Sequence, residues 1–200
     1  IFFAVPRVWE KFREGIRENV ATLARPQRVL AERYLHLAAR KGRVTGVGPA
    51  LSWAERLQYR TLDALVGRTV RTQLGLDRAR YLVCAAAPVH PDLLRWFHGL
   101  GLPVAEVYGQ TENCGVSTMN PPDDIRVGTV GIAVPGVEVR IAEDGEVLSR
   151  GDNVTIGYHR DELGTSELLD DAGWMHTGDL GVIDTDGYLT ITGRKKDLII

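Results

Sequence analysis

Cysteine is scarce in this 200-residue chain, and the positions of its two copies, Cys84 and Cys114, exclude a disulfide framework and a thiolate zinc site. Two isolated thiols are typical of a cytoplasmic protein. An excess of charge of one sign is also lacking, because 24 Lys and Arg nearly balance 26 Asp and Glu. The net charge of -2 therefore gives no reason to expect nucleic acid or an acidic membrane surface as a partner.

Long hydrophobic runs are absent as well, since no apolar stretch approaches the ~20 residues that span a bilayer. The apolar start, Ile1 to Val5, lacks the basic segment and the cleavage site of a secretion signal. The phosphate-binding pattern Gly-x-x-x-x-Gly-Lys-[Ser/Thr] and the hydrolase pattern Gly-x-Ser-x-Gly do not occur. Because the chain begins without Met and ends on Leu198-Ile199-Ile200, we expect an internal segment of a longer protein.

What the chain does contain is an ordinary globular composition, with 44% hydrophobic and 25% charged residues. Apolar spacing predicts helices over residues 6–24, 27–40 and 53–74, the last with a break near Gly67. The period then changes to a strand at 81–84, a helix at 91–100 and a strand at 103–107. This βαβ pattern predicts an α/β fold, in which helices flank a parallel sheet.

From Val127 onward the pattern is that of β structure. Apolar and polar residues alternate over 137–141, a turn at Asp144-Gly145 leads into 146–148, and a second hairpin surrounds Asp186-Gly187. We therefore expect an α/β part over residues 1–126, a mostly antiparallel β part over 127–192, and the start of a further domain over 193–200.

The most informative segment is Tyr108-Gly109-Gln110-Thr111-Glu112, which follows the second predicted strand. It offers an aromatic ring, a close backbone approach, a hydroxyl and a carboxylate in succession. Such groups can hold a nucleotide, and a carboxylate beside a hydroxyl can hold Mg²⁺ against the same phosphate oxygens. The alternative is a helix N-terminus, with Thr111 as the cap and Glu112 in the first turn.

Two later segments carry further candidate groups. His176-Thr177-Gly178-Asp179 presents an exposed carboxylate on a glycine turn, where Asp179 can accept both hydroxyls of a ribose; the alternative is an ordinary Asx turn. Gly193-Arg194-Lys195-Lys196-Asp197 presents the guanidinium of Arg194 to ribose or phosphate oxygens; the alternative is a solvated basic cluster. The histidines lack metal-ligand spacing, and we expect none of them to be catalytic.

In their order and approximate spacing, these three segments resemble the adenylate-forming, or AMP-binding, enzyme superfamily. That superfamily includes acyl-CoA synthetases, firefly-type luciferases and nonribosomal-peptide adenylation domains. The start of the chain, Ala4 to Lys11, resembles the long-chain fatty acid–CoA ligase branch. Supporting matches lie between the three segments, at Gly128-Thr129-Val130-Gly131 with Pro135-Gly136, at Gly145-Glu146-Val147 through Gly157-Tyr158, and at Asp171-Ala172-Gly173-Trp174.

The resemblance implies ATP-dependent activation of a long-chain fatty acid in two steps. The carboxylate attacks the α-phosphate of ATP to give acyl-AMP and pyrophosphate, and the thiol of coenzyme A then takes the acyl group. It implies ATP, Mg²⁺ and coenzyme A as cofactor and co-substrates, and it places residues 1–192 in the AMP-binding N-terminal domain. Fatty acid substrates favour peripheral membrane association of a cytoplasmic enzyme.

The resemblance also implies roles for individual residues. Tyr108 would lie against adenine, with Gly109 allowing a close approach. Thr111 would bind phosphate and Glu112 would hold Mg²⁺, and these two are the catalytic candidates. Asp179 would accept the ribose hydroxyls.

The remaining implied roles belong to Arg194, beside the ribose and phosphates, to Lys196, at the hinge to a C-terminal domain, and to Ala86 and Ala87, against the nucleotide. One departure concerns Ala85, where the family usually has glycine. If the backbone there needs a positive φ, the alanine adds strain of about 1 kcal/mol.

Two parts of the family's phosphate clamp are missing from these 200 residues. They are the upstream Gly/Ser/Thr-rich loop and the C-terminal lysine, so we expect this segment alone to be inactive. Two alternatives remain open: a fatty acyl-AMP ligase or other adenylate-forming enzyme that uses a carrier-protein thiol, and a non-catalytic nucleotide-binding protein of the same fold.

Overall fold

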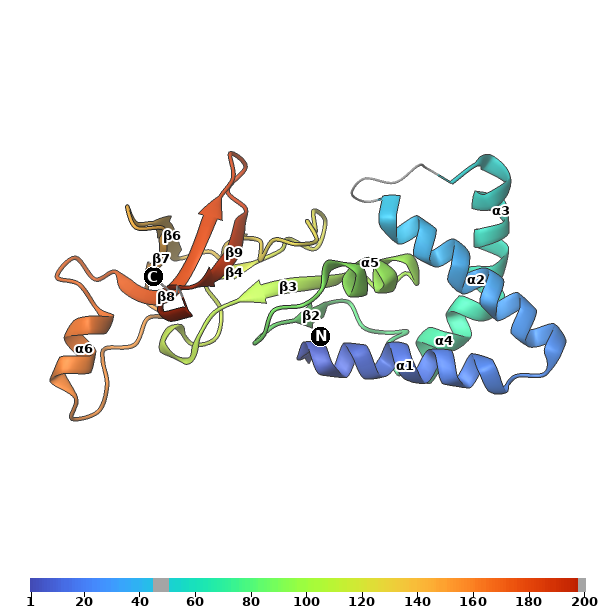
Figure 1. The fold of residues 1–200 in the computed structure, drawn as a ribbon, viewed down its shortest axis with the longest axis horizontal. Helices are drawn as coiled ribbons and strands as arrows, with labels where there is room; N and C mark the ends of the chain where they lie inside the picture. Colours follow the sequence, from blue (N-terminus) through green and yellow to red (C-terminus); the bar gives the residue numbers. More distant parts are fainter. Residues whose placement is uncertain (45–50, 198–200) are drawn as a thin grey trace. The chain divides into compact units, whose positions relative to one another are not determined.

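In the described part of the chain, helices predominate up to Tyr108, with three short strands among them, and strands predominate thereafter (Figure 1). The structure, a computed structural model, describes residues 1–44 and 51–197. It forms two compact units, Ile1–Ala105 and Glu106–Ile200. The α/β fold expected from the sequence is confirmed. The proposed assignment of residues 1–126, 127–192 and 193–200 to family domains stays a prediction, and residues 198–200 lie outside the described part.

The first unit contains helices around a short parallel pair of strands, β1 (Phe2–Ala4) and β2 (Leu82–Cys84). Its helical elements agree with the apolar spacing, and the break predicted near Gly67 is a π-helical turn. They are α1 (Pro6–Thr22), α2 (Arg25–Val44), α3 (Trp53–Leu62), η1 (Asp63–Gly67), α4 (Arg68–Gln73) and α5 (Pro91–Gly99).

The π-helical turn η1 lies against a buried tyrosine. The hydroxyl of Tyr34, a fully buried residue of α2, donates to Asp63 Oδ1 at 2.7 Å. Arg71 donates to both carboxylate oxygens of Asp63, at 2.8 and 3.1 Å. A Cβ on Gly67 would lie 2.3 Å from the Tyr34 hydroxyl, so only glycine fits at the end of this turn.

The second unit begins within β3 (Val104–Tyr108), which pairs antiparallel with β4 (Thr118–Met119), and β4 pairs with β5 (Ile132–Ala133). The parallel arrangement predicted for the first sheet is thus present at β1 and β2, while β3 has an antiparallel neighbour. A four-stranded antiparallel sheet follows in the order β6-β7-β8-β9. Its strands are β6 (Val137–Ile141), β7 (Glu146–Gly151), β8 (Met175–Ile183) and β9 (Leu189–Arg194), and both predicted hairpins are confirmed.

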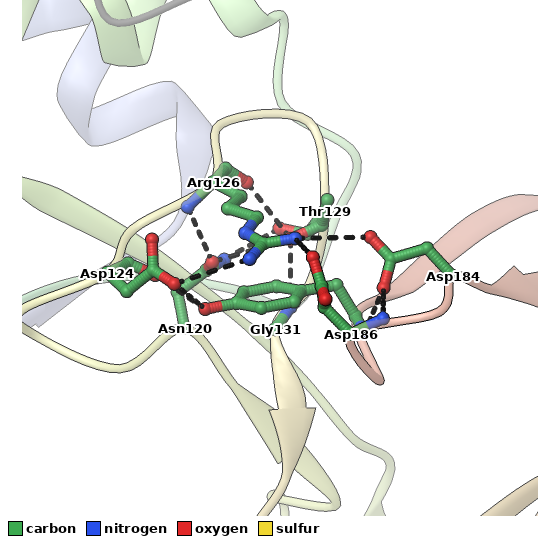
Figure 2. A network of polar contacts seen from close by, with 8 residues as sticks. Asn120, Asp124, Arg126, Thr129, Gly131, Asp184 and Asp186 are labelled. Carbon is green, nitrogen blue, oxygen red and sulfur yellow. Dashed lines mark hydrogen bonds and ion pairs between the residues drawn. The ribbon is translucent and has the colours of Figure 1, made fainter.

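Arg126 ties the loop between β4 and β5 to the turn between β8 and β9 (Figure 2). Its guanidinium lies 2.8 Å from Asp186 and 3.4 Å from both Asp124 and Asp184. It also covers the ring of Tyr188, with 3.9 Å between the guanidinium carbon and the ring centroid. Three carboxylates that would repel one another therefore share one cation, which offsets part of their repulsion.

The described part of the second unit also contains three helical elements. They are the short helices η2 (Thr111–Asn113) and η3 (Lys195–Asp197) and the longer α6 (Glu162–Leu168). The sequence did not predict α6. Among the described residues, no helix combines the length and the apolar character that crossing a bilayer requires.

Candidate functional site

The three segments singled out in the sequence meet at the carboxylate of Asp179. Its Oδ2 accepts hydrogen bonds from the Tyr108 hydroxyl and from Gln110 Nε2, both at 2.8 Å. Its Oδ1 lies 3.1 Å from Arg194 Nε. One buried carboxylate thus joins the end of β3, the middle of β8 and the last residue of β9.

The environment of Asp179 differs from the sequence prediction. Its carboxylate was expected to be exposed on a loop, but Asp179 is 5% exposed and lies inside β8. The sheet explains the difference, because Asp179 is the cross-strand partner of Arg194 in the antiparallel β8–β9 register. A carboxylate has about four acceptor positions, and the protein fills three of them.

Tyr108 is held as a hydrogen-bond donor beside this carboxylate. Burial raises the pKa of its hydroxyl, and the contact with Asp179 raises it further, so the phenol stays protonated. Arg194 is more accessible, with its side chain 54% exposed. A ligand that approaches Asp179 can therefore share or displace the Arg194 contact more easily than the Tyr108 contact.

Gly109 is needed for a contact within its own loop. A Cβ at this position would lie 2.4 Å from the carbonyl oxygen of Gly115 and 2.7 Å from the nitrogen of Val116. Gly115 N donates to Gln110 O at 2.8 Å and so closes the loop on itself. The close backbone approach predicted at Gly109 is therefore a contact with the backbone of Gly115 and Val116 in the same loop.

The short helix η2 is capped by Gln110 rather than by Thr111. Gln110 N donates to Asn113 Oδ1 at 2.7 Å, which completes a capping box around the turn. Thr111 begins η2 with an exposed side chain, and Glu112 occupies its first turn. The helix-cap alternative is thus wrong about the capping residue and right about the position of Glu112.

Glu112 is held from both sides by the segment before α6. Its Oε1 accepts from the Tyr158 hydroxyl at 2.8 Å, and its backbone carbonyl accepts from Thr155 N at 2.7 Å. No group of three or more His, Cys, Asp or Glu side chains in the described residues is arranged to hold a metal ion. A single half-buried carboxylate beside a threonine hydroxyl fits Mg²⁺, which takes hard oxygen ligands and commonly uses one or two carboxylates together with substrate phosphates.

A cavity of about 450 Å³ opens beside Asp179. It is lined by Thr177 and Gly178 of β8, by Arg194 at the end of β9, and by Lys195 and Lys196 of η3. Three cationic side chains line this wall, and two of them are paired with carboxylates, so phosphate oxygens would compete with the carboxylates for Arg194 and Lys195. Lys196, the predicted hinge residue, is therefore an exposed part of the same wall.

Ala86 and Ala87 follow β2 in the first unit, and both are exposed. Ala85, where strain was expected, is buried and is not among the residues with positive φ. The left-handed conformation falls one residue later, at Ala86, with a φ of 71°. The expected strain of about 1 kcal/mol therefore belongs to Ala86.

Three polar residues of this region were not assigned a role from the sequence: Gln110, Glu146 and Tyr158. Each lies inside a segment that carried the family resemblance, so the signal was present. Gln110 contacts Asp179, and Tyr158 contacts Glu112. Glu146 contacts Gly178 and Lys195 in the wall of the cavity.

Comparison with known proteins finds relatives along the whole chain. A family model described as "AMP-binding enzyme" matches residues 1–159. Long-chain-fatty-acid–CoA ligase FadD15 of Mycobacterium bovis is 38% identical over 213 residues, covering 100% of this chain and 32% of that protein. Long-chain-fatty-acid–CoA ligase ACSBG2 of Xenopus laevis is 36% identical, covering 100% of this chain and 27% of that protein. The chain spans about a third of the length of the curated relatives it matches.

Solved structures of enzymes also match most of this chain. ATP-bound MatB from Rhodopseudomonas palustris matches with a TM-score of 0.59 and 35% identity, over 70% of this chain and 30% of that one. A Mycobacterium tuberculosis fatty acyl CoA synthetase matches with a TM-score of 0.56 and 30% identity, over 70% of this chain and 30% of that one.

Proposed function

Since the chain belongs to the family of AMP-binding enzymes, we propose that the protein it forms part of is an AMP-forming long-chain fatty acid–CoA ligase. A fatty acid carboxylate oxygen bonds to the α-phosphorus of ATP, and the bond from that phosphorus to pyrophosphate breaks. The sulfur of coenzyme A then bonds to the acyl carbon as AMP leaves and the thiol proton is released. Atoms and charge balance in both steps without a redox partner.

The observation that carries this proposal is the arrangement around Asp179. Its carboxylate has one acceptor position left and a second that the accessible Arg194 can yield, beside a cavity lined by three cationic side chains, which suits the two hydroxyls of a ribose followed by phosphates. In this proposal Asp179 accepts the ribose hydroxyls, and Arg194 contacts the ribose and phosphate oxygens. Tyr108 places its ring against adenine.

Thr111 and Glu112 act on the phosphates in this proposal. The Thr111 hydroxyl donates to a phosphate oxygen, and Glu112 holds Mg²⁺ through the carboxylate that Tyr158 orients. When bound, Mg²⁺ neutralises the negative charge that develops on the phosphate oxygens. Ala86 and Ala87 are assigned to the nucleotide from the family resemblance alone, and Lys196 serves as the pivot toward a C-terminal domain.

Fatty-acid-dependent ATP–pyrophosphate exchange in the complete protein tests the proposal. We expect exchange with the wild type and a loss of at least about a hundredfold in Glu112→Ala, because the metal loses its protein carboxylate. Glu167→Ala is the matched control, since this exposed glutamate lies in α6 and alanine suits a helix. Absence of exchange in the wild type, or an unchanged rate in Glu112→Ala, would contradict the proposal.

The identity of the thiol acceptor needs a separate measurement. Incubation with ATP, a long-chain fatty acid and either coenzyme A or a carrier protein bearing phosphopantetheine separates the two ligase types by product. We expect acyl-CoA, in agreement with the names of the relatives. Acyl transfer to the carrier alone would instead support a fatty acyl-AMP ligase.

A further inference from the structure

Glu146 is a buried carboxylate that the proposed chemistry does not use. It begins β7, is 3% exposed, and uses both of its carboxylate oxygens. Oε1 accepts from the backbone N–H of Gly178 at 2.8 Å. Oε2 lies 3.0 Å from both Lys195 Nζ and His176 Nδ1.

Two of the three residues that contact the carboxylate of Glu146, Gly178 and Lys195, are adjacent in sequence to residues that the proposed function assigns to the nucleotide. Gly178 precedes Asp179, and Lys195 follows Arg194. Gly178 and Lys195 also line the cavity beside Asp179. The carboxylate of Glu146 therefore supports two neighbouring parts of the cavity wall.

Gly178 lies at an irregularity of β8, where the pairing with β7 shifts its register. Its φ is 69°, and no heavy atom would lie within 4 Å of an added Cβ, so no side chain packs against this position. The hydrogen bond to Glu146 fixes the direction of its N–H instead. That N–H belongs to the Thr177–Gly178 peptide, so Glu146 fixes the chain one peptide before Asp179, whose own N–H donates to Thr177 Oγ1 at 3.1 Å.

Glu146 remains charged in this setting. Burial alone raises its pKa, but the hydrogen bonds from His176, Lys195 and Gly178 outweigh burial and hold the pKa below its usual value. The half-exposed Lys195 is thereby kept against the sheet, where Asp144 Oδ2 also contacts it at 2.6 Å. A lysine head group held by two carboxylates cannot swing across the cavity.

We propose that Glu146 is a positioning residue for nucleotide binding, which sets Asp179 and Arg194 by holding Gly178 and Lys195. The inference rests on the proposed function, because it assumes that the cavity beside Asp179 takes the nucleotide. It adds a residue that does not itself contact the nucleotide and acts only through its two neighbours.

The test is the steady-state kinetics of ATP–pyrophosphate exchange in the complete protein with Glu146→Gln. Glutamine keeps the shape and an acceptor for Gly178 but removes the charge that holds Lys195. We expect the KM for ATP to rise about tenfold while kcat changes by less than about threefold, because binding that is equal in the ground state and the transition state is lost. Glu138→Gln is the matched control: its carboxylate pairs with Arg150 on the same sheet, and we expect both constants to stay unchanged.

A double-mutant cycle with Lys195→Met separates positioning from general stability. Lys195 is half exposed, so this variant should fold even where Glu146→Gln does not. We expect it to raise the KM for ATP several-fold, and we expect Glu146→Gln to add little on that background. A lowered melting temperature with an unchanged KM for ATP in either variant would overturn the inference.

Failure of the inference is distinguishable from failure of the proposed function. If the wild type shows no fatty-acid-dependent exchange, the proposed function fails. If the wild type exchanges normally and either Glu146→Gln or Lys195→Met keeps the wild-type KM for ATP, the positioning role alone is wrong.

Discussion

Replacing Gly109 by alanine is expected to destabilise the second unit and to displace the loop that carries Thr111 and Glu112. The new Cβ would lie 2.4 Å from Gly115 O, whereas ordinary contacts begin near 3.4 Å. The loop must therefore open by about 1 Å, the difference between those two distances. The atoms in the way are backbone atoms, so no side chain can rotate to relieve the contact.

The cost can be bounded from the structure. Overpacking of a rigid site costs about 1–3 kcal/mol, and we expect the upper half of that range because the Gly115 N–H bond to Gln110 O must lengthen as well. The φ of Gly109 is not in the left-handed region, so backbone conformation adds nothing to this cost. A displacement of about 1 Å at a reacting centre can lower the rate about a hundredfold.

Native-state hydrogen exchange of the amides of β8 and β9 measures the stability of this unit, and ATP–pyrophosphate exchange in the complete protein measures the effect on activity. Gly15→Ala is the matched control, because no heavy atom lies within 4 Å of its added Cβ in α1. That substitution should stabilise α1 by about 0.5–1 kcal/mol. Protection of β8 and β9 in Gly109→Ala within about 0.5 kcal/mol of the wild type would refute the steric argument.

Three further expectations follow from single contacts. Ala86→Gly should raise stability by about 1 kcal/mol in thermal unfolding, because glycine relieves the left-handed strain; a decrease would contradict this. Arg71→Met should destabilise the first unit by about 2 kcal/mol in urea unfolding, because Asp63 keeps only the Tyr34 donor for a partly buried charge. The folded-state pKa of Glu146 lies below its usual value of about 4.3. The stability that this carboxylate contributes is therefore present at neutral pH and is lost as the pH falls through the lowered pKa. Glu146→Gln should accordingly flatten the acid limb of a curve of unfolding free energy against pH.

The sequence predicted best where hydrophobic periodicity and turn residues agree. The helix over 6–24 was found as α1 (Pro6–Thr22), and Pro6 at its first position explains the sharp start. The turns at Asp144-Gly145 and Asp186-Gly187 correctly marked both hairpins of the antiparallel sheet, because glycine at positive φ is a local requirement.

Features that depend on tertiary contacts escaped the sequence. The π-helical turn η1 ends at Gly67 beside the hydroxyl of Tyr34, and Tyr34 comes from another helix. In the sequence, Glu146 is simply a polar residue that follows a turn. Its burial depends on the pairing between β7 and β8. The position of strain at Ala86 rather than Ala85 likewise depends on how the loop leaves β2.

For the candidate site, the sequence identified which segments matter but not how they meet. Tyr108, Asp179 and Arg194 were selected individually, by chemical type and by family resemblance. Their mutual contacts, and the part played by Gln110, required the three-dimensional arrangement. Roles for Thr111 and Glu112 remain predictions that the activity measurements test.

The pairing of Asp179 with Arg194 depends on an irregularity that residue types alone do not reveal. Near the turn, β8 and β9 pair in one register, with Gly181 opposite Ile191. Continued without change, that register would place Gly193 opposite Asp179, and the carboxylate would have no cation across the strand. The register instead shifts by one residue between Leu180 and Gly181, which brings Arg194 to Asp179. Because a one-residue slip exchanges the two faces of a strand, this shift determines whether the guanidinium reaches the cavity at all.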